Sequence, residues 1–95
     1  MPMTREHVSI HGKVQGVFFR ASAKDMAHLF GIKGWIKNCF DGSVEAVFEG
    51  EKEAVDSVVN WCKKGPPGAL VTSIDVEKEK YLGEFNDFSI VYSYA

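Results

Sequence analysis

Hydrophobic and polar residues alternate along four segments of the chain, which is the pattern of a β-strand buried on one face. In the first segment, Val8 and Ile10 alternate with Ser9 and His11. A fifth segment, around Trp35, is a further strand candidate. Together these patterns predict strands over residues 6–12, 32–39, 44–49, 70–77 and 88–94.

Two other segments repeat their hydrophobic residues every three or four positions, as the buried face of a helix does. The first begins at residue 21 and ends before Gly31, a natural C-terminal cap. The second runs from about residue 52 to residue 64 and stops at a Gly-Pro-Pro-Gly turn. We expect the helical core positions to be Ala23, Met26, Ala27, Phe30, Val55, Val58, Val59 and Cys62.

The predicted order is strand–helix–strand–strand–helix–strand, followed by one more strand. Asp41-Gly42 separates the second and third strands and favours a tight hairpin turn, because such pairs tolerate positive φ. This order predicts an α+β fold in which two helices pack on one face of a mainly antiparallel sheet. A length of 95 residues suffices for one domain, so residues 1–95 are expected to form a single unit.

Composition and net charge exclude some classes of binding partner for this protein. The formal net charge is −2, the sequence pI is about 5.9, and 45% of the residues are hydrophobic. This hydrophobic content is typical of a globular protein and argues against disorder. A broad basic surface for nucleic acid is excluded, so an anionic ligand would need a local site. No apolar run is long enough for a membrane span or an export signal, and we therefore expect a cytoplasmic protein.

The cysteines and histidines predict no metal site. Cys39 and Cys62 form no Cys-x-x-Cys motif and are expected to be reduced thiols. The three histidines lack the spacing of zinc ligands relative to these cysteines.

The loop between the first strand and the first helix is the best candidate for an anion site. It spans residues 12–20 and lies at a helix N-terminus, where free backbone N–H groups and the helix dipole attract anions. Residues 15–19 include no Ser, Thr, Asp or Asn to cap these amides, and Ser22 lies beyond the bend. Gly16 allows a tight turn and close approach of a ligand. The amides are therefore open to an external acceptor.

Two side chains near this loop have two interpretations each. Arg20 is one of only two arginines, against nine lysines, and could hold a phosphate with its guanidinium. Its spacing is equally typical of a surface arginine on an amphipathic helix. Asn38 ends the second predicted strand. Its amide could bond its own turn, or it could hold a water or a substrate oxygen.

These two regions resemble a known family. The sequence GKVQGVFFR at residues 12–20 looks like the first signature of the acylphosphatases. The sequences GWIKN at residues 34–38 and DGSVE at residues 41–45 resemble the second. WCKKGPP at residues 61–67 and FSIVY at residues 88–92 are similar to later family segments, so the resemblance covers nearly the whole chain.

The resemblance implies a ferredoxin-like fold and an enzyme that hydrolyses acyl phosphates to a carboxylate and inorganic phosphate, without a metal or cofactor. In such enzymes the asparagine orients the attacking water, a role that falls to Asn38. Cys39 follows it, where some members carry a hydroxyl residue that could assist the water. The phosphate would be held by the loop amides and the arginine, which correspond to Gln15, Gly16, Val17, Phe18, Phe19 and Arg20.

Two alternatives belong to other functional classes. An RNA-binding module would read bases with sheet aromatics, but the negative charge and the missing RNP-type sequence disfavour it. A non-catalytic or regulatory ferredoxin-like domain could keep the loop as an anion sensor. Similar domains also occur inside larger proteins such as hydrogenase maturation factors, although this chain ends soon after the predicted fold is complete. We expect a monomer whose partner is a small-molecule acyl phosphate.

Overall fold

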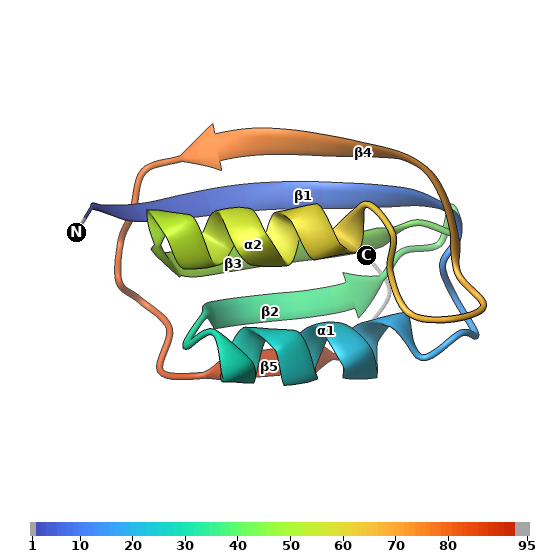
Figure 1. The fold of residues 1–95 in the computed structure, drawn as a ribbon, viewed down its shortest axis with the longest axis horizontal. Coiled ribbons are helices and arrows are strands. Elements are labelled where there is room, and N and C mark those ends of the chain that lie inside the picture. The colour runs from blue at the N-terminus through green and yellow to red at the C-terminus, as the bar shows by residue number, and fades with distance from the viewer. Residues whose placement is uncertain (1, 93–95) are drawn as a thin grey trace.

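The computed structural model describes residues 2–92, which form five strands and two helices. One sheet contains all five strands in the order β4-β1-β3-β2-β5. All neighbouring pairs are antiparallel except β2 and β5, which run parallel. This architecture confirms the predicted α+β, ferredoxin-like class (Figure 1). The elements are β1 (Met3–Lys13), α1 (Phe19–Leu29), β2 (Lys33–Asn38), β3 (Val44–Glu51), α2 (Lys52–Cys62), β4 (Leu70–Glu79) and β5 (Phe88–Val91).

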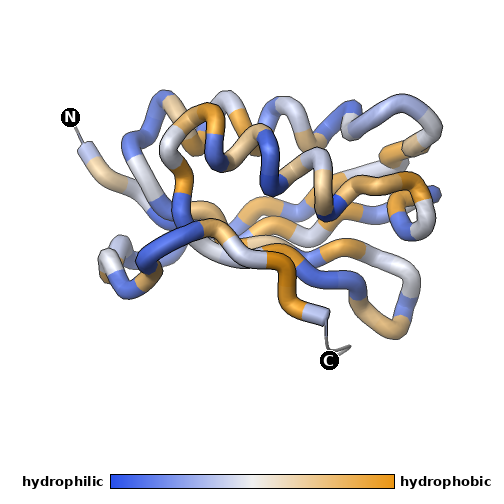
Figure 2. The backbone as a smooth tube through the Cα atoms, turned by 90° about the horizontal axis from the view of Figure 1, so that it is seen from below, coloured by the Kyte–Doolittle hydropathy of each residue, from blue (hydrophilic) through white to orange (hydrophobic). Residues whose placement is uncertain are grey.

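Both helices cover the same face of the sheet. In Figure 1, α2 lies over β1 and β3, and α1 lies over β2 and β5. Viewed along the sheet, the molecule has a helical layer and a strand layer (Figure 2). The core fills the space between them, because β1, β2, β3 and β5 turn hydrophobic side chains toward the helices. The alternation over residues 70–77 predicted a buried face for β4 as well, but this edge strand has no buried residue and adds only the partly buried Val71 and Ile74. The largest fully buried side chains include Phe19, Phe48, Phe88, Ile10 and Ile36.

The first helix starts earlier than the hydrophobic period indicated. It begins at Phe19 rather than Ala21, because Phe18 adopts a left-handed conformation (φ 63°, ψ 26°) and turns the chain directly into the helix. Its end confirms the expected glycine signal: Gly31 has φ 69° and donates to the carbonyl of His28, while Ile32 donates to Ala27. These two bonds form a Schellman cap.

Two of the predicted core positions are wrong or only partly right. Phe30 is 39% exposed, and Met26 is half-buried. The inner face of α1 is instead built from Phe19, Ala23 and Ala27, which lie four residues apart. Phe30 occupies the C-terminal cap, where the backbone has already left the helical conformation, so the four-residue spacing no longer places its side chain on the inner face.

The remaining boundaries shift by a few residues. The first strand reaches back to Met3 because its partner β3 extends to Glu51. The second helix ends at Cys62, so the two lysines after it lie beyond its last turn. The fifth strand is described only over Phe88–Val91, and the last two residues of the predicted segment, 93 and 94, lie outside the described residues.

A carboxylate cluster fastens the connection between β4 and β5. Glu49, 2% exposed, accepts hydrogen bonds from the backbone N–H groups of Leu82 (2.9 Å) and Gly83 (3.3 Å). Arg5 bridges Glu49 to Glu84 and also pairs with Glu79. These contacts fix the path of the chain into β5, the strand that closes the sheet beside β2.

Candidate active site

The loop at residues 14–18 presents backbone donors rather than side-chain caps. Gly16 (φ 75°) and Phe18 (φ 63°) both adopt left-handed backbone conformations. No side chain caps α1, and its first turn holds no acidic residue. Among residues 2–92, the backbone N–H groups of residues 15–21 donate to no protein acceptor; the first bonded amide is that of Ser22, to the carbonyl of Phe18. The sequence prediction of open amides is confirmed.

The side chain of Gln15 braces this loop instead of facing a ligand. Its Nε2 donates to the carbonyl oxygens of Cys39 (2.8 Å) and Ser43 (2.9 Å). These carbonyls belong to the turn between β2 and β3. That turn is closed by Asp41, which accepts from the backbone N–H and the hydroxyl of Ser43. These bonds from Ser43 lower the pKa of Asp41 below its usual value.

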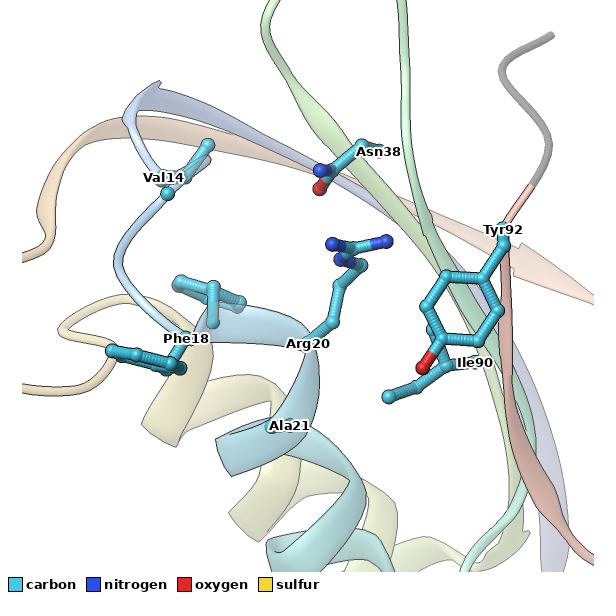
Figure 3. Close-up of a pocket in the computed structure, with 9 residues that line it drawn as sticks. Val14, Phe18, Arg20, Ala21, Asn38, Ile90 and Tyr92 are labelled. Atoms are coloured by element: carbon cyan, nitrogen blue, oxygen red, sulfur yellow. The ribbon is translucent and has the colours of Figure 1, made fainter.

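Arg20 is the second residue of α1. Across the described part of the chain, no carboxylate lies within ion-pair distance of it. Its Cζ atom lies 5.4 Å from the ring centroid of Tyr92. Figure 3 shows the side chain extending into the pocket between Asn38 and this ring.

Asn38 ends β2 and points toward the guanidinium of Arg20 (Figure 3). It is 7% exposed, and its Oδ1 is buried without a hydrogen-bond partner among residues 2–92. The side chain therefore does not serve its own turn, because Asp41 does so. An unpaired buried amide oxygen is costly and marks a position where a polar ligand fits. Cys39, beside it, donates from Sγ to Glu45 (3.7 Å) and does not line the pocket.

These residues surround one pocket of about 370 Å³, within the usual size range of small-molecule sites. The pocket brings together most of the predicted site residues. Val17 and Gln15 are the exceptions: Val17 packs against the core and Gln15 braces the turn, so each could contribute only its backbone. The lining residues are Val14, Gly16, Phe18, Phe19, Arg20, Ala21, Asn38, Ile90 and Tyr92.

Sequence reasoning missed the wall formed by Ile90 and Tyr92. The sequence pattern places both in the last predicted strand and in a segment similar to the acylphosphatases, and gives neither a role in the site. The register Lys37↔Val91 places the end of β5 beside the end of β2, and thus places Tyr92 near Asn38. No local pattern predicts this parallel pairing, because it depends on which strand the last segment joins.

Among the residues that the structure describes, the pocket offers positive charge and fixed donors, and its lining includes no Asp, Glu, His, Lys or Cys. Besides the Arg20 guanidinium, its ionisable group is the phenol of Tyr92. Such a lining suits chemistry that depends on orientation and on stabilisation of negative charge. Within residues 2–92, no group of three or more His, Cys, Asp or Glu side chains is arranged to hold a metal ion. Neither helix of the described chain has the length and apolar character needed to span a membrane.

Known proteins are similar to this chain in both sequence and fold. A sequence model of the Acylphosphatase family matches residues 6–90. An acylphosphatase from Pyrobaculum calidifontis is 56% identical over 90 residues, covering 94% of this chain and 82% of its relative. One from Pelotomaculum thermopropionicum is 49% identical, covering 97% of this chain and 100% of its relative. The crystal structure of acylphosphatase from Bacillus subtilis superposes with a TM-score of 0.90 at 38% identity, over 94% of this chain and 99% of that one. The chain therefore belongs to the acylphosphatase family.

Proposed function

We propose that this acylphosphatase-family protein cleaves the carboxyl–phosphate bond of acyl phosphates with the pocket at the N-terminus of α1. The phosphate group binds to the free amides of residues 15–20 and to the Arg20 guanidinium. Asn38 orients the attacking water through its buried Oδ1. The observation that carries this proposal is the convergence on one pocket of backbone amides, a guanidinium and an amide oxygen that have no hydrogen-bond or ion-pair partner within residues 2–92.

The reaction needs few groups because its leaving group is a carboxylate. The parent acid has a pKa on the order of 4 to 5, so the carboxylate departs without being protonated. Phosphoryl transfer through a loose transition state mainly requires positioning and stabilisation of charge on the phosphoryl oxygens. Fixed amides and a guanidinium supply both before the reaction starts.

The electron and proton balance is simple. The water oxygen forms a bond to phosphorus while the bond between phosphorus and the acyl oxygen breaks. The bonding electrons leave with the carboxylate, and a phosphoryl oxygen accepts the proton of the water. Asn38 Oδ1 accepts a hydrogen bond from the water and thereby directs its lone pair at phosphorus.

The test is a continuous assay of a small aromatic acyl phosphate with native protein, Arg20→Ala and Asn38→Ala. Each variant should fold and lose about two to three decades of rate, the usual cost of one donor aimed at developing charge. Arg20→Ala should affect both kcat and KM, whereas Asn38→Ala should mainly lower kcat.

The matched controls for this assay are Lys24→Ala, one turn along α1, and Asn60→Ala, on the exposed side of α2. Both should keep the native rate. Full activity in purified Arg20→Ala or Asn38→Ala would refute the assigned role. Native protein that binds inorganic phosphate without turning over the substrate would instead be an anion sensor.

The proposal also covers the setting in which the enzyme works. It treats residues 1–95 as one acylphosphatase-like domain, acting as a monomer in the cytoplasm on a small-molecule substrate and binding no nucleic acid. The net charge of −2 supports the last point. Size-exclusion chromatography with light scattering and a gel shift with single-stranded RNA test these points directly.

A further inference from the structure

The two arginines of this chain are held in opposite ways. Arg5 contacts the carboxylates of Glu49, Glu79 and Glu84, and the hydrogen bond to Glu84 makes the largest contribution to raising its pKa further above the usual value. Arg20 has no carboxylate partner among residues 2–92 and lies instead over the ring of Tyr92.

At its position in the first turn of α1, the Arg20 guanidinium needs a group that stabilises its charge and holds its orientation. The first turn of a helix carries the positive end of the helix dipole, which repels a cation. A long, flexible side chain there also loses rotamer entropy when it is held in one orientation. A carboxylate would hold it, but it would also neutralise the guanidinium and compete with a bound anion. An aromatic face attracts the cation through the quadrupole of its ring. Because the ring carries no net charge and does not take up the N–H donors of the guanidinium, these donors stay free for an anion.

The placement of Tyr92 fits this role better than a role in packing. Its side chain is 76% exposed, so it contributes little to the core. It follows directly after β5, whose register with β2 brings it to the same end of the sheet as Asn38. Figure 3 shows the ring flanking the guanidinium at the edge of the pocket.

We propose that Tyr92 is a positioning residue of the active site, whose ring orients the Arg20 guanidinium toward the bound phosphate without neutralising it. This inference rests on the proposed function, because it assigns Arg20 to the phosphate. It predicts that the ring is required and the hydroxyl is not. It also predicts that a carboxylate at position 92 weakens anion binding.

The test compares Tyr92→Phe, Tyr92→Leu and Tyr92→Glu, with inorganic phosphate as the probe. Phosphate inhibition constants and KM should rise about two- to fivefold in Tyr92→Leu, the change expected from losing an exposed cation–π contact. Tyr92→Phe should restore native values. Tyr92→Glu should raise the inhibition constant about tenfold or more, because the new carboxylate pairs with Arg20. Val91→Ala, at the adjacent position in β5, is the control for a disturbed strand end and should leave phosphate binding unchanged.

A spectroscopic readout separates orientation of Arg20 from general structure. The Arg20 Nε–H resonance should carry a ring-current shift that persists in Tyr92→Phe and disappears in Tyr92→Leu. If Tyr92→Leu matches Tyr92→Phe in this resonance and in phosphate affinity, the inference is overturned. If the rate falls in Tyr92→Leu while the resonance and the phosphate affinity both stay unchanged, Tyr92 has only a structural role, and the inference is overturned as well.

The two proposals fail in different ways. Phosphate titration followed by this resonance requires no turnover, so it tests the role of Tyr92 even if native protein hydrolyses no acyl phosphate. If native protein is active and Arg20→Ala is inactive, but Tyr92→Leu behaves as native, only the further inference fails.

Discussion

Gln15 and Cys39 are joined by a 2.8 Å hydrogen bond from the Gln15 Nε2 to the Cys39 carbonyl oxygen. The bond connects the loop before α1 to the residue that follows Asn38. A second bond from the same Nε2, to the carbonyl of Ser43, locks the side chain between two points of one turn. The separation between the amide loop and Asn38 is therefore set by one neutral side chain rather than by a charge.

Replacing this brace should affect both stability and rate. Gln15→Met keeps the length of the side chain but removes both donated bonds. We expect the free energy of unfolding to fall by about 1–3 kcal/mol. We expect kcat/KM to fall about ten- to hundredfold, because small displacements of reacting groups are costly. Denaturant titration and steady-state kinetics measure the two effects, and Lys13→Ala is the control at the exposed end of β1. A stability loss with unchanged kinetics would contradict the bracing role.

Phe18 occupies a backbone conformation that favours glycine. At φ 63° a side chain costs about 1–2 kcal/mol, and this ring recovers little of that cost because it is 82% exposed. Phe18→Gly removes the strain, and Phe18→Ala keeps it. After the extra unfolded-state entropy of glycine, the Gly variant should be up to about 1 kcal/mol more stable than the Ala variant. Denaturant midpoints measured side by side give the answer; an Ala variant that is the more stable would show that the strain is not there.

Glu6 should make stability depend on pH. It is 4% exposed, and burial, together with the charge of Asp56, raises the pKa of its carboxyl above 4.5. The folded state therefore keeps a proton that the unfolded state releases first, and the stability provided by the neutral form is lost as pH rises through the folded pKa. Glu6→Gln should stabilise the protein at neutral pH, and the gain should vanish below about pH 4. Thermal unfolding at pH 4 and pH 7 measures this difference; an equal gain at both values would mean that ionisation is not the cause.

Hydrolysis should not require a divalent metal ion, because Arg20 and the loop amides supply the positive charge at the phosphoryl oxygens in the proposed mechanism. Dialysis against a chelator should leave kcat and KM unchanged within experimental error. The same assay repeated with added Mg²⁺ or Zn²⁺ provides the comparison. Activity that is lost on chelation and returns with either ion would count against this mechanism.

Local signals in the sequence predicted the local parts of the site. The missing cap before α1, the left-handed glycines and the Asp41-Gly42 turn are all properties of short segments. Their physical basis is backbone freedom and hydrogen bonding within a few residues, which can be read from the chain itself.

What the sequence could not supply depends on contacts between distant segments. The sequence gives the backbone amide of Gln15 a place in the phosphate loop, but nothing local predicts that its side chain bonds the turn after β2. Phe30 continued the helical pattern but lies beyond the last turn of α1. Ile90 and Tyr92 line the pocket only because β5 joins β2 in parallel, and Asn38 differs from an ordinary turn asparagine only because Asp41 closes the turn in its place.

The parallel pairing of β5 with β2 also determines when the pocket can form during synthesis of the chain. Arg20 and Asn38 leave the ribosome well before the strand that leads to Tyr92 does. A parallel neighbour this distant in sequence can be added only after a large loop has closed, which is entropically costly and slow. A nascent chain thus carries its arginine and asparagine well before it has the ring beside them, and the complete site forms only when β5 docks beside β2.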